Sequence, residues 1–167
     1  MNGSSIYDMT QRHDDASEID SAPVRGRLPQ LKQQRSLYIL CIDDDAGVRE
    51  FLNDCFTHFN HRVVVASGGK HGLELFRTAT LKHQPYEVVI TDLGMPDIDG
   101  QCVARTIKAE SPNTPVIMMT GWGTFMEAEG ETASPVDAVV GKPPRMQELN
   151  DLVLRITTPA ATPSCPP

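Results

Sequence analysis

The stretch LYILCIDDD, residues 37–45, places three acids directly after a run of six mainly apolar residues. Three further apolar runs lead to polar residues: 86–90 to Thr91 and Asp92, 116–119 to Thr120, and 136–140 to Lys142 two residues later. Short runs rich in β-branched residues, without regular alternation, are typical of strands buried on both faces. Because open parallel sheets bind ligands at the carboxyl ends of their strands, these polar groups are expected to share one site. Acids, a hydroxyl and an amine suit a divalent cation and a phosphoryl group.

Segments with helical periodicity lie between these runs. In the first, Asp45 stands at the N-cap position, and apolar residues follow at the spacing of one helix face: Val48, Phe51, Leu52, Cys55, Phe56 and Phe59. Weaker stripes occupy 73–76 and 103–107, another follows Pro143-Pro144 at 149–156, and 63–65 is a further strand. A fourth helix is expected over Thr124–Ser134, an acidic segment with little apolar periodicity. Strand and helix then alternate five times, which predicts an α/β fold with a parallel sheet covered on both faces.

The composition predicts one folded domain between two tails. Residues 1–36 contain five acids, five bases and few large apolar side chains, so we expect a disordered N-terminal arm or linker. Residues 37–157 form the predicted domain, of about 120 residues, and 158–167 a proline-rich C-terminal tail. The net charge of −7 lies in the predicted domain and argues against direct nucleic-acid binding.

The sequence also indicates a protein that does not insert into membranes. No apolar stretch approaches the roughly 20 residues that span a bilayer, and no signal peptide opens the chain. The four cysteines show no paired spacing, which is typical of free thiols in a reducing compartment. We therefore expect a cytoplasmic location.

Four blocks of the sequence resemble the signature blocks of response-regulator receiver domains: Leu40–Asp45, Thr91–Gly100, Met119–Gly121 and Gly141–Pro144. The resemblance covers residues 37–157 and implies a (βα)5 flavodoxin-like fold, with a doubly wound five-stranded parallel sheet. It implies an aspartate phosphorylated by a sensor histidine kinase or a phosphotransfer protein, with Mg²⁺ as cofactor. By the same resemblance, the protein is expected to be a phosphoacceptor signalling domain and not an enzyme that acts on a separate substrate. It would catalyse its own phosphorylation and dephosphorylation, and its phosphorylation would switch contacts with an unknown output partner.

The resemblance also assigns roles to individual residues. Asp92 is the implied phosphoacceptor, whose carboxylate attacks phosphorus. Lys142 neutralises a phosphoryl oxygen as a point charge, and the hydroxyl of Thr120 donates to another. The implied Mg²⁺ ligands are oxygens, as this ion prefers: the carboxylates of Asp43, Asp44 and Asp92 and the backbone carbonyl of Gly94.

Three other interpretations of these residues are possible. A haloacid-dehalogenase-like phosphatase would use Asp43 as nucleophile and Asp45 as acid, but it leaves Asp92 unexplained. A binding module that signals without phosphorylation is disfavoured because all five site residues are present. A zinc site is suggested weakly by three-residue spacing: Cys55, His58 and His61.

Three positions depart from the family pattern. Val139 stands where a Tyr or Phe usually swings inward, and a β-branched aliphatic residue cannot make that large change. Gly94 offers no side chain to position an attacking water, while Trp122 is able to shield the phosphoryl group, so slow autodephosphorylation is expected.

The chain fits either a single-domain regulator or the terminal receiver of a hybrid kinase.

Overall fold

The computed structural model describes residues 35–121 and 135–158. They contain a five-stranded parallel sheet in the order β2-β1-β3-β4-β5. Each strand overlaps one of the five predicted runs, although β3 and β5 begin two residues later than predicted. The strands are β1 (Tyr38–Ile42), β2 (Arg62–Ala66), β3 (Val88–Asp92), β4 (Val116–Thr120) and β5 (Ala138–Gly141). The chain passes from β1 outward to β2 and returns to β3 on the other side of β1. The order of strands therefore reverses between β1 and β3, the place where doubly wound sheets bind ligands.

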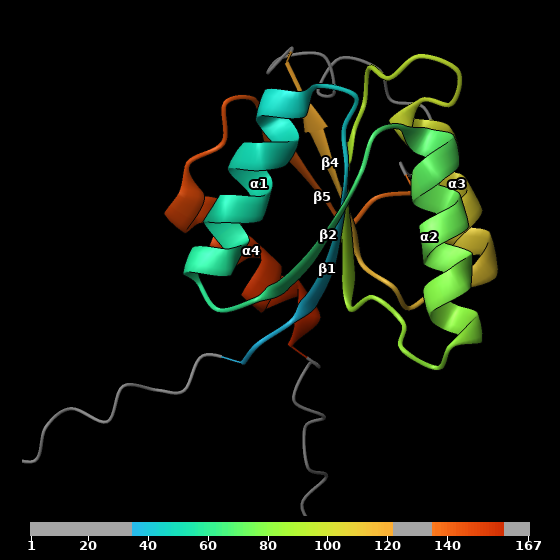
Figure 1. Cartoon of the computed structure of the whole chain (residues 1–167), viewed down its shortest axis with the longest axis horizontal. Helices are drawn as coiled ribbons and strands as arrows, with labels where there is room; N and C mark the ends of the chain where they lie inside the picture. Colours follow the sequence, from blue (N-terminus) through green and yellow to red (C-terminus); the bar gives the residue numbers. More distant parts are fainter. Residues whose placement is uncertain (1–34, 122–134, 159–167) are drawn as a thin grey trace, which may run out of the picture. The chain divides into compact units, whose positions relative to one another are not determined.

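Four helices cover the two faces of this sheet (Figure 1). On one face lie α1 (Ala46–His58) and α4 (Met146–Thr157), and on the other lie α2 (Gly69–Leu81) and α3 (Gly100–Glu110). The predicted α/β fold with a doubly wound parallel sheet is confirmed. The expected helix over Thr124–Ser134 lies outside the described residues. Within the described part of the chain, no helix has both the length and the apolar character needed to cross a membrane.

Local sequence explains where the helices begin. As predicted, the Asp45 side chain caps α1 by accepting the backbone N–H of Val48 at 2.9 Å. Asp99 caps α3 in the same way, accepting the N–H of Cys102 at 2.7 Å. The Pro143-Pro144 pair precedes α4 rather than forming its first turn, because α4 begins at Met146.

The apolar core has two layers, one on each side of the sheet. Large side chains of α2 and α3, including Phe76 and Ile107, pack on one face. Those of α1 and α4, including Phe56 and Val153, pack on the other. All residues of β3 and β4 are buried, so the expectation of strands buried on both faces is confirmed for the centre of the sheet.

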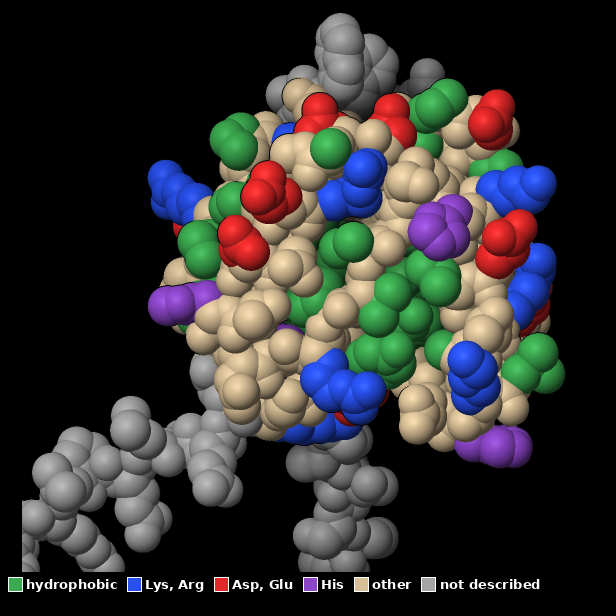
Figure 2. All heavy atoms as spheres, viewed as in Figure 1, with side chains coloured by type: hydrophobic (Ala, Val, Ile, Leu, Met, Phe, Trp, Pro, Cys, Tyr) green, Lys and Arg blue, Asp and Glu red, His purple; other side chains and the backbone are tan. Residues whose placement is uncertain are grey.

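The same expectation is wrong for the two edge strands. In β5 half-buried and exposed residues alternate, and Val139 is 41% exposed. The three valines of β2, residues 63–65, are only half-buried. Figure 2 shows hydrophobic side chains at the surface between α1 and α2, over the β2 edge. An edge strand has a neighbour on one side only, so an uninterrupted apolar run does not by itself mean complete burial.

Candidate functional site

The strand ends bring the predicted polar residues to one edge of the sheet. Asp43 follows β1 directly and Asp92 is the last residue of β3, so the two flank the point where strand order reverses. Thr120 ends β4 and is 4% exposed. Lys142 follows β5, and its backbone N–H donates to the carbonyl of Thr120 at 2.8 Å. Sequence spacing alone therefore located four neighbouring groups that are far apart along the chain.

Lys142 joins the acids of β1 and β3. Its Nζ lies 2.6 Å from Oδ2 of Asp43 and 2.8 Å from Oδ1 of Asp92. Asp43 has no exposed surface, Asp92 is 7% exposed, and the side chain of Lys142 is 21% exposed. Two carboxylates that repel each other in a partly dry site are thus held together by one ammonium group.

The environment shifts the pKa of both partners. Burial raises the pKa of the Asp43 carboxyl, although hydrogen bonds from Lys142 and from the N–H of Asp45 oppose this effect. Burial alone would lower the pKa of Lys142, but its hydrogen bonds to Asp43 and Asp92 outweigh burial and hold that pKa above its ordinary value. Lys142 is therefore a permanent cation at neutral pH, and ionisation of Asp43 depends on nearby positive charge.

The acids of this edge fit a hard divalent cation. Carboxylate oxygens of Asp43, Asp44 and Asp92 all lie within 4.8 Å of one another. Asp43 and Asp92 are buried, whereas Asp44 is exposed. Three carboxylates around one point, with open solvent on the Asp44 side, match an ion that takes oxygen ligands and keeps several waters, as Mg²⁺ does.

Gly94 also lies at this site. A Cβ atom built on Gly94 would be 4.0 Å from Oδ2 of Asp92, and no other atom comes closer. The backbone of Gly94 therefore runs beside the Asp92 carboxylate, and a larger side chain at this position has room to face it. Trp122, the other residue tied to the expected lifetime of a phosphoryl group, lies outside the described residues.

The structure does not support the alternative of a zinc site. The ring of His61 is buried, with Nδ1 accepting the N–H of Leu37 at 3.1 Å and Nε2 lying 2.9 Å from Oδ1 of Asn150. Cys55 Sγ faces the carbonyl of Met146. Within the described residues, the three acids are the group placed to share one ion.

Two residues at the site were missed in the sequence. Arg49 donates from Nη1 to the backbone carbonyls of Asp43 and Asp44, at 2.9 and 2.8 Å. Gly100 begins α3 with its Cα against the end of β3, so a Cβ there would lie 2.1 Å from the carbonyl oxygen of Asp92. Spacing offered a signal for Arg49, which is one helical turn after the cap Asp45, but none for the close approach at Gly100.

Replacing Gly100 by alanine is expected to destabilise the protein by about 2 kcal/mol, since overpacking against backbone is not relieved by a side-chain rotation. The measurement is chemical denaturation of Gly100→Ala against Gly141→Ala. A Cβ at Gly141 meets no atom within 4 Å, so that control should change stability by less than about 0.5 kcal/mol. Equal stability of the two variants would contradict the tight contact at Asp92.

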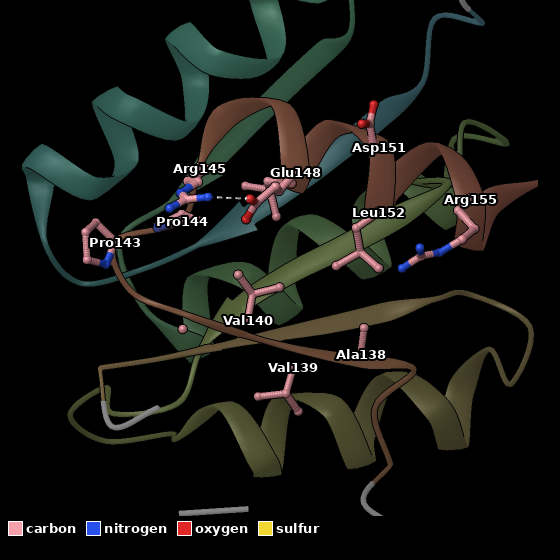
Figure 3. Close-up of a pocket in the computed structure, with 12 residues that line it drawn as sticks. Ala138, Val139, Val140, Pro143, Pro144, Arg145, Glu148, Asp151, Leu152 and Arg155 are labelled. Carbon is pink, nitrogen blue, oxygen red and sulfur yellow. Dashed lines mark hydrogen bonds and ion pairs between the residues drawn. The ribbon is translucent and has the colours of Figure 1, made fainter. Parts of the chain in front are cut away.

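A surface hollow of about 670 Å³ lies beside the site, between β5 and α4. Figure 3 shows Val140 pointing toward α4, Val139 on the opposite side of β5, and a hydrogen bond between Arg145 and Glu148, which is 2.9 Å long. Apolar residues of β5 line the hollow together with apolar and charged residues of α4. This mixed surface is suited to a protein partner more than to a small apolar ligand.

Comparison with known sequences agrees with this geometry. A model of the family described as "Response regulator receiver domain" matches residues 39–154. The chain is 32% identical over 142 residues to the probable transcriptional regulator ycf27 of Guillardia theta, covering 83% of this chain and 53% of that protein. It is 31% identical over 106 residues to the transcriptional regulatory protein GlrR of Escherichia coli K12, covering 64% of this chain and 23% of that protein. The chain thus spans about half, or less, of the length of these relatives.

Solved structures give the same result. A response regulator receiver domain protein from Clostridium thermocellum has a TM-score of 0.63 and 28% identity, covering 72% of this chain and 94% of that one. The response regulator protein TrrA from Thermotoga maritima, solved in complex with Mg²⁺ and BeF, has a TM-score of 0.64 and 25% identity, covering 72% and 98%.

Proposed function

The chain belongs to the response-regulator receiver family of two-component signalling, and from this premise we propose that Asp92 is its phosphoacceptor. Response regulators interact in general with histidine kinases and with output partners. The phosphoryl donor proposed for this chain is a phosphohistidine of a sensor histidine kinase or a phosphotransfer protein. The observation that carries the proposal is the ion pairing of Lys142 with both Asp43 and Asp92, which holds two acids and a cation at one strand edge.

The residues suggest the following chemistry. A carboxylate oxygen of Asp92 forms a bond to phosphorus while the bond from phosphorus to the histidine nitrogen breaks, and the leaving imidazole takes a proton. Lys142, already 2.8 Å from Asp92, is placed to pair with a phosphoryl oxygen. Thr120, at the end of the adjacent strand, is proposed to donate its hydroxyl to another.

Asp43, Asp44 and Asp92, with the carbonyl of Gly94, are proposed to hold Mg²⁺. When bound, Mg²⁺ supplies positive charge against the phosphoryl oxygens and the carboxylates. The acidic cluster within 4.8 Å supports this ligand set, and so does the Mg²⁺ in the TrrA structure from Thermotoga maritima. Asp45 is left out of the set because its side chain caps α1.

The phosphatase alternative fits the geometry less well. Asp43, which would be its nucleophile, is fully buried. Its Oδ1 accepts the N–H of Asp45 at 2.9 Å and its Oδ2 is paired with Lys142. A carboxylate with both oxygens engaged is poorly placed to attack phosphorus. Asp92 has one oxygen paired with Lys142 and the other facing Gly94.

Incubation with acetyl phosphate tests the proposed function. With Mg²⁺, we expect one phosphoryl equivalent per chain, bound as an acyl phosphate that hydroxylamine removes. With EDTA in place of Mg²⁺, incorporation should fall to background. A product stable to hydroxylamine, or labelling of equal extent in EDTA, would contradict the proposal.

The surroundings of the domain are part of the proposal. Residues 1–36 are proposed as an arm or linker, 37–157 as the receiver domain and 158–167 as a tail, in a cytoplasmic single-domain regulator or the terminal receiver of a hybrid kinase. The output is proposed to pass through protein contacts, without direct nucleic-acid binding or membrane insertion.

Because Val139 replaces the usual aromatic residue, the phosphorylated state is expected to differ mainly in the loop after Thr120.

Mg²⁺ should stabilise the folded protein, because the ion binds the assembled cluster and not the unfolded chain. At a concentration ten times its dissociation constant, the expected gain is about 1.4 kcal/mol. Asp44→Asn should lose most of this gain, whereas Asp45→Asn should keep it, since asparagine also caps helices. Thermal unfolding with and without Mg²⁺ measures the effect. Equal gains in both variants would mean that the ligand is not Asp44.

The side chain at position 94 should control how long the phosphoryl group lasts. Gly94 offers no hydrogen-bonding side chain, and the structure leaves room beside Oδ2 of Asp92. Gly94→Asn should therefore shorten the acyl-phosphate lifetime by orienting water, while Gly94→Ala, which adds no polar group, should change it little. Loss of label after removal of the donor gives the rates. Identical decay of Asn and Ala variants would argue against this role.

A further inference from the structure

The loop that carries the first two acids is held from several sides. The N–H of Asp43 donates to the carbonyl of Ala66 at 3.1 Å, and Oδ1 of Asp43 accepts the N–H of Asp45 at 2.9 Å. The carbonyls of Asp43 and Asp44 both accept from Nη1 of Arg49, at 2.9 and 2.8 Å. One half-buried guanidinium group on α1 therefore fixes two successive peptide units of the loop.

Asp44 depends on this backbone constraint more than its neighbours do. Asp43 and Asp45 are each oriented by hydrogen bonds of their own side chains. The exposed carboxylate of Asp44 makes no hydrogen bond or ion pair with any residue in 35–121 or 135–158. The direction of its side chain is thus set mainly by the peptide units on either side, the same two that Arg49 holds.

We propose that Arg49 is a positioning residue for the metal ligand Asp44, which it aims at the shared ion site by clamping the carbonyls of Asp43 and Asp44. This inference rests on the proposed function of the acidic cluster. Hydrogen bonds from a charged donor are short and strong. Partners that orient a metal ligand typically change metal affinity by about 10–100-fold when they are removed. Because Arg49 is only half-buried, the lower end of that range is expected.

Removing Arg49 should change the Mg²⁺ affinity in opposite directions, depending on whether Arg49 acts by positioning the loop or only through its charge. The positive charge of Arg49 repels a divalent cation, so if charge were its only effect, removing it would tighten Mg²⁺ binding. If Arg49 positions the loop, removing it weakens binding in spite of the relieved repulsion. Lysine separates the two effects further, because it keeps the charge but lacks the reach and the planar geometry of the guanidinium group.

The test is a calorimetric titration of the full chain with Mg²⁺ alone, without a phosphodonor. Arg49→Gln and Arg49→Lys should each bind Mg²⁺ about tenfold more weakly than the unaltered chain. Arg105→Gln is the matched control, since Arg105 is an exposed arginine on α3, and its affinity should stay within about twofold of the original. In the Asp44→Asn background, Arg49→Gln should add no further loss, because the ligand it positions is already gone.

Phosphorylation by acetyl phosphate supplies a second readout. In Arg49→Gln, the Mg²⁺ concentration for half-maximal rate should rise about tenfold, with the rate at saturating Mg²⁺ close to the original. General loss of structure would instead lower the saturated rate as well. Unchanged or tighter Mg²⁺ binding in Arg49→Gln, or an equal loss in the Asp44→Asn background, would overturn the inference. Absence of Mg²⁺ binding or phosphorylation in the unaltered chain would overturn the proposed function itself.

Discussion

Asp92→Asn protein should take up no detectable phosphoryl group from acetyl phosphate and Mg²⁺. An amide oxygen is a far weaker nucleophile than a carboxylate. Of the other two acids in the cluster, Asp43 has both oxygens engaged, and Asp44 lies on the exposed loop after β1 and not at the end of β3. The substitution preserves shape. It also removes one of two negative charges paired with Lys142, so the folded state should be at least as stable as before in the absence of metal. Intact-mass spectrometry after incubation measures the uptake.

Asp97→Asn is the matched control for this prediction. Asp97 is exposed, lies five residues further along, and has a positive φ of 68°, a conformation that asparagine tolerates well. Asp97→Asn protein should take up as much phosphoryl group as the unaltered chain does. A second site labelled to full stoichiometry in Asp92→Asn would contradict the assignment of the phosphoacceptor.

Among the substitutions proposed, replacement of Lys142 should lower the free energy of unfolding the most. Lys142→Gln leaves the fully buried Asp43 and the nearly buried Asp92 facing each other without a cation. Removing one partner of a buried ion pair costs about 3–5 kcal/mol, and the partial exposure of Lys142 favours the lower figure. Phosphorylation should also slow strongly, since no ammonium group remains to pair with the phosphoryl oxygen.

This loss should depend on pH in a definite direction. Burial already raises the pKa of Asp43, and removing Lys142 raises it further. A folded carboxyl with a raised pKa is favoured when protonated, so the deficit grows as the pH rises through that pKa and shrinks at lower pH. Urea denaturation at neutral and at mildly acidic pH measures both values.

The control is another lysine of similar exposure. Nζ of Lys108 lies 2.7 Å from Oδ2 of Asp137, and its side chain is 22% exposed against 21% for Lys142. Asp137, however, is 38% exposed, so Lys108→Gln should cost no more than about 1 kcal/mol at either pH. If both lysine variants lose the same stability, the pairing of Lys142 with buried acids is not an important stabilising feature of the fold.

Much of the fold and the candidate site follows from sequence pattern. Strand ends are marked by a change from apolar to polar residues, as at Ile42–Asp43, and parallel strands bring such ends to one edge. Asp45 was recognisable as a cap because capping depends on residues only three apart in sequence. These features are local or repeat with a fixed period, so a single sequence contains them.

Other features depend on packing between distant segments. The exposure of Val139 follows from β5 being an edge strand, which an apolar run does not reveal. The tight contact of Gly100 with Asp92 depends on how α3 approaches β3. The clamp formed by Arg49 depends on the path of a loop. The buried His61 has its ring against Asn150 of α4, which is far along the chain.

Identifying the residue that carries the phosphoryl group tests the assignment of Asp92 as phosphoacceptor. Borohydride converts an aspartyl phosphate to homoserine, so peptide mass mapping after reduction locates the modified position. We expect homoserine in place of Asp92 and unmodified aspartate at positions 43, 44 and 45. Conversion at Asp43 or Asp44, with Asp92 intact, would contradict it.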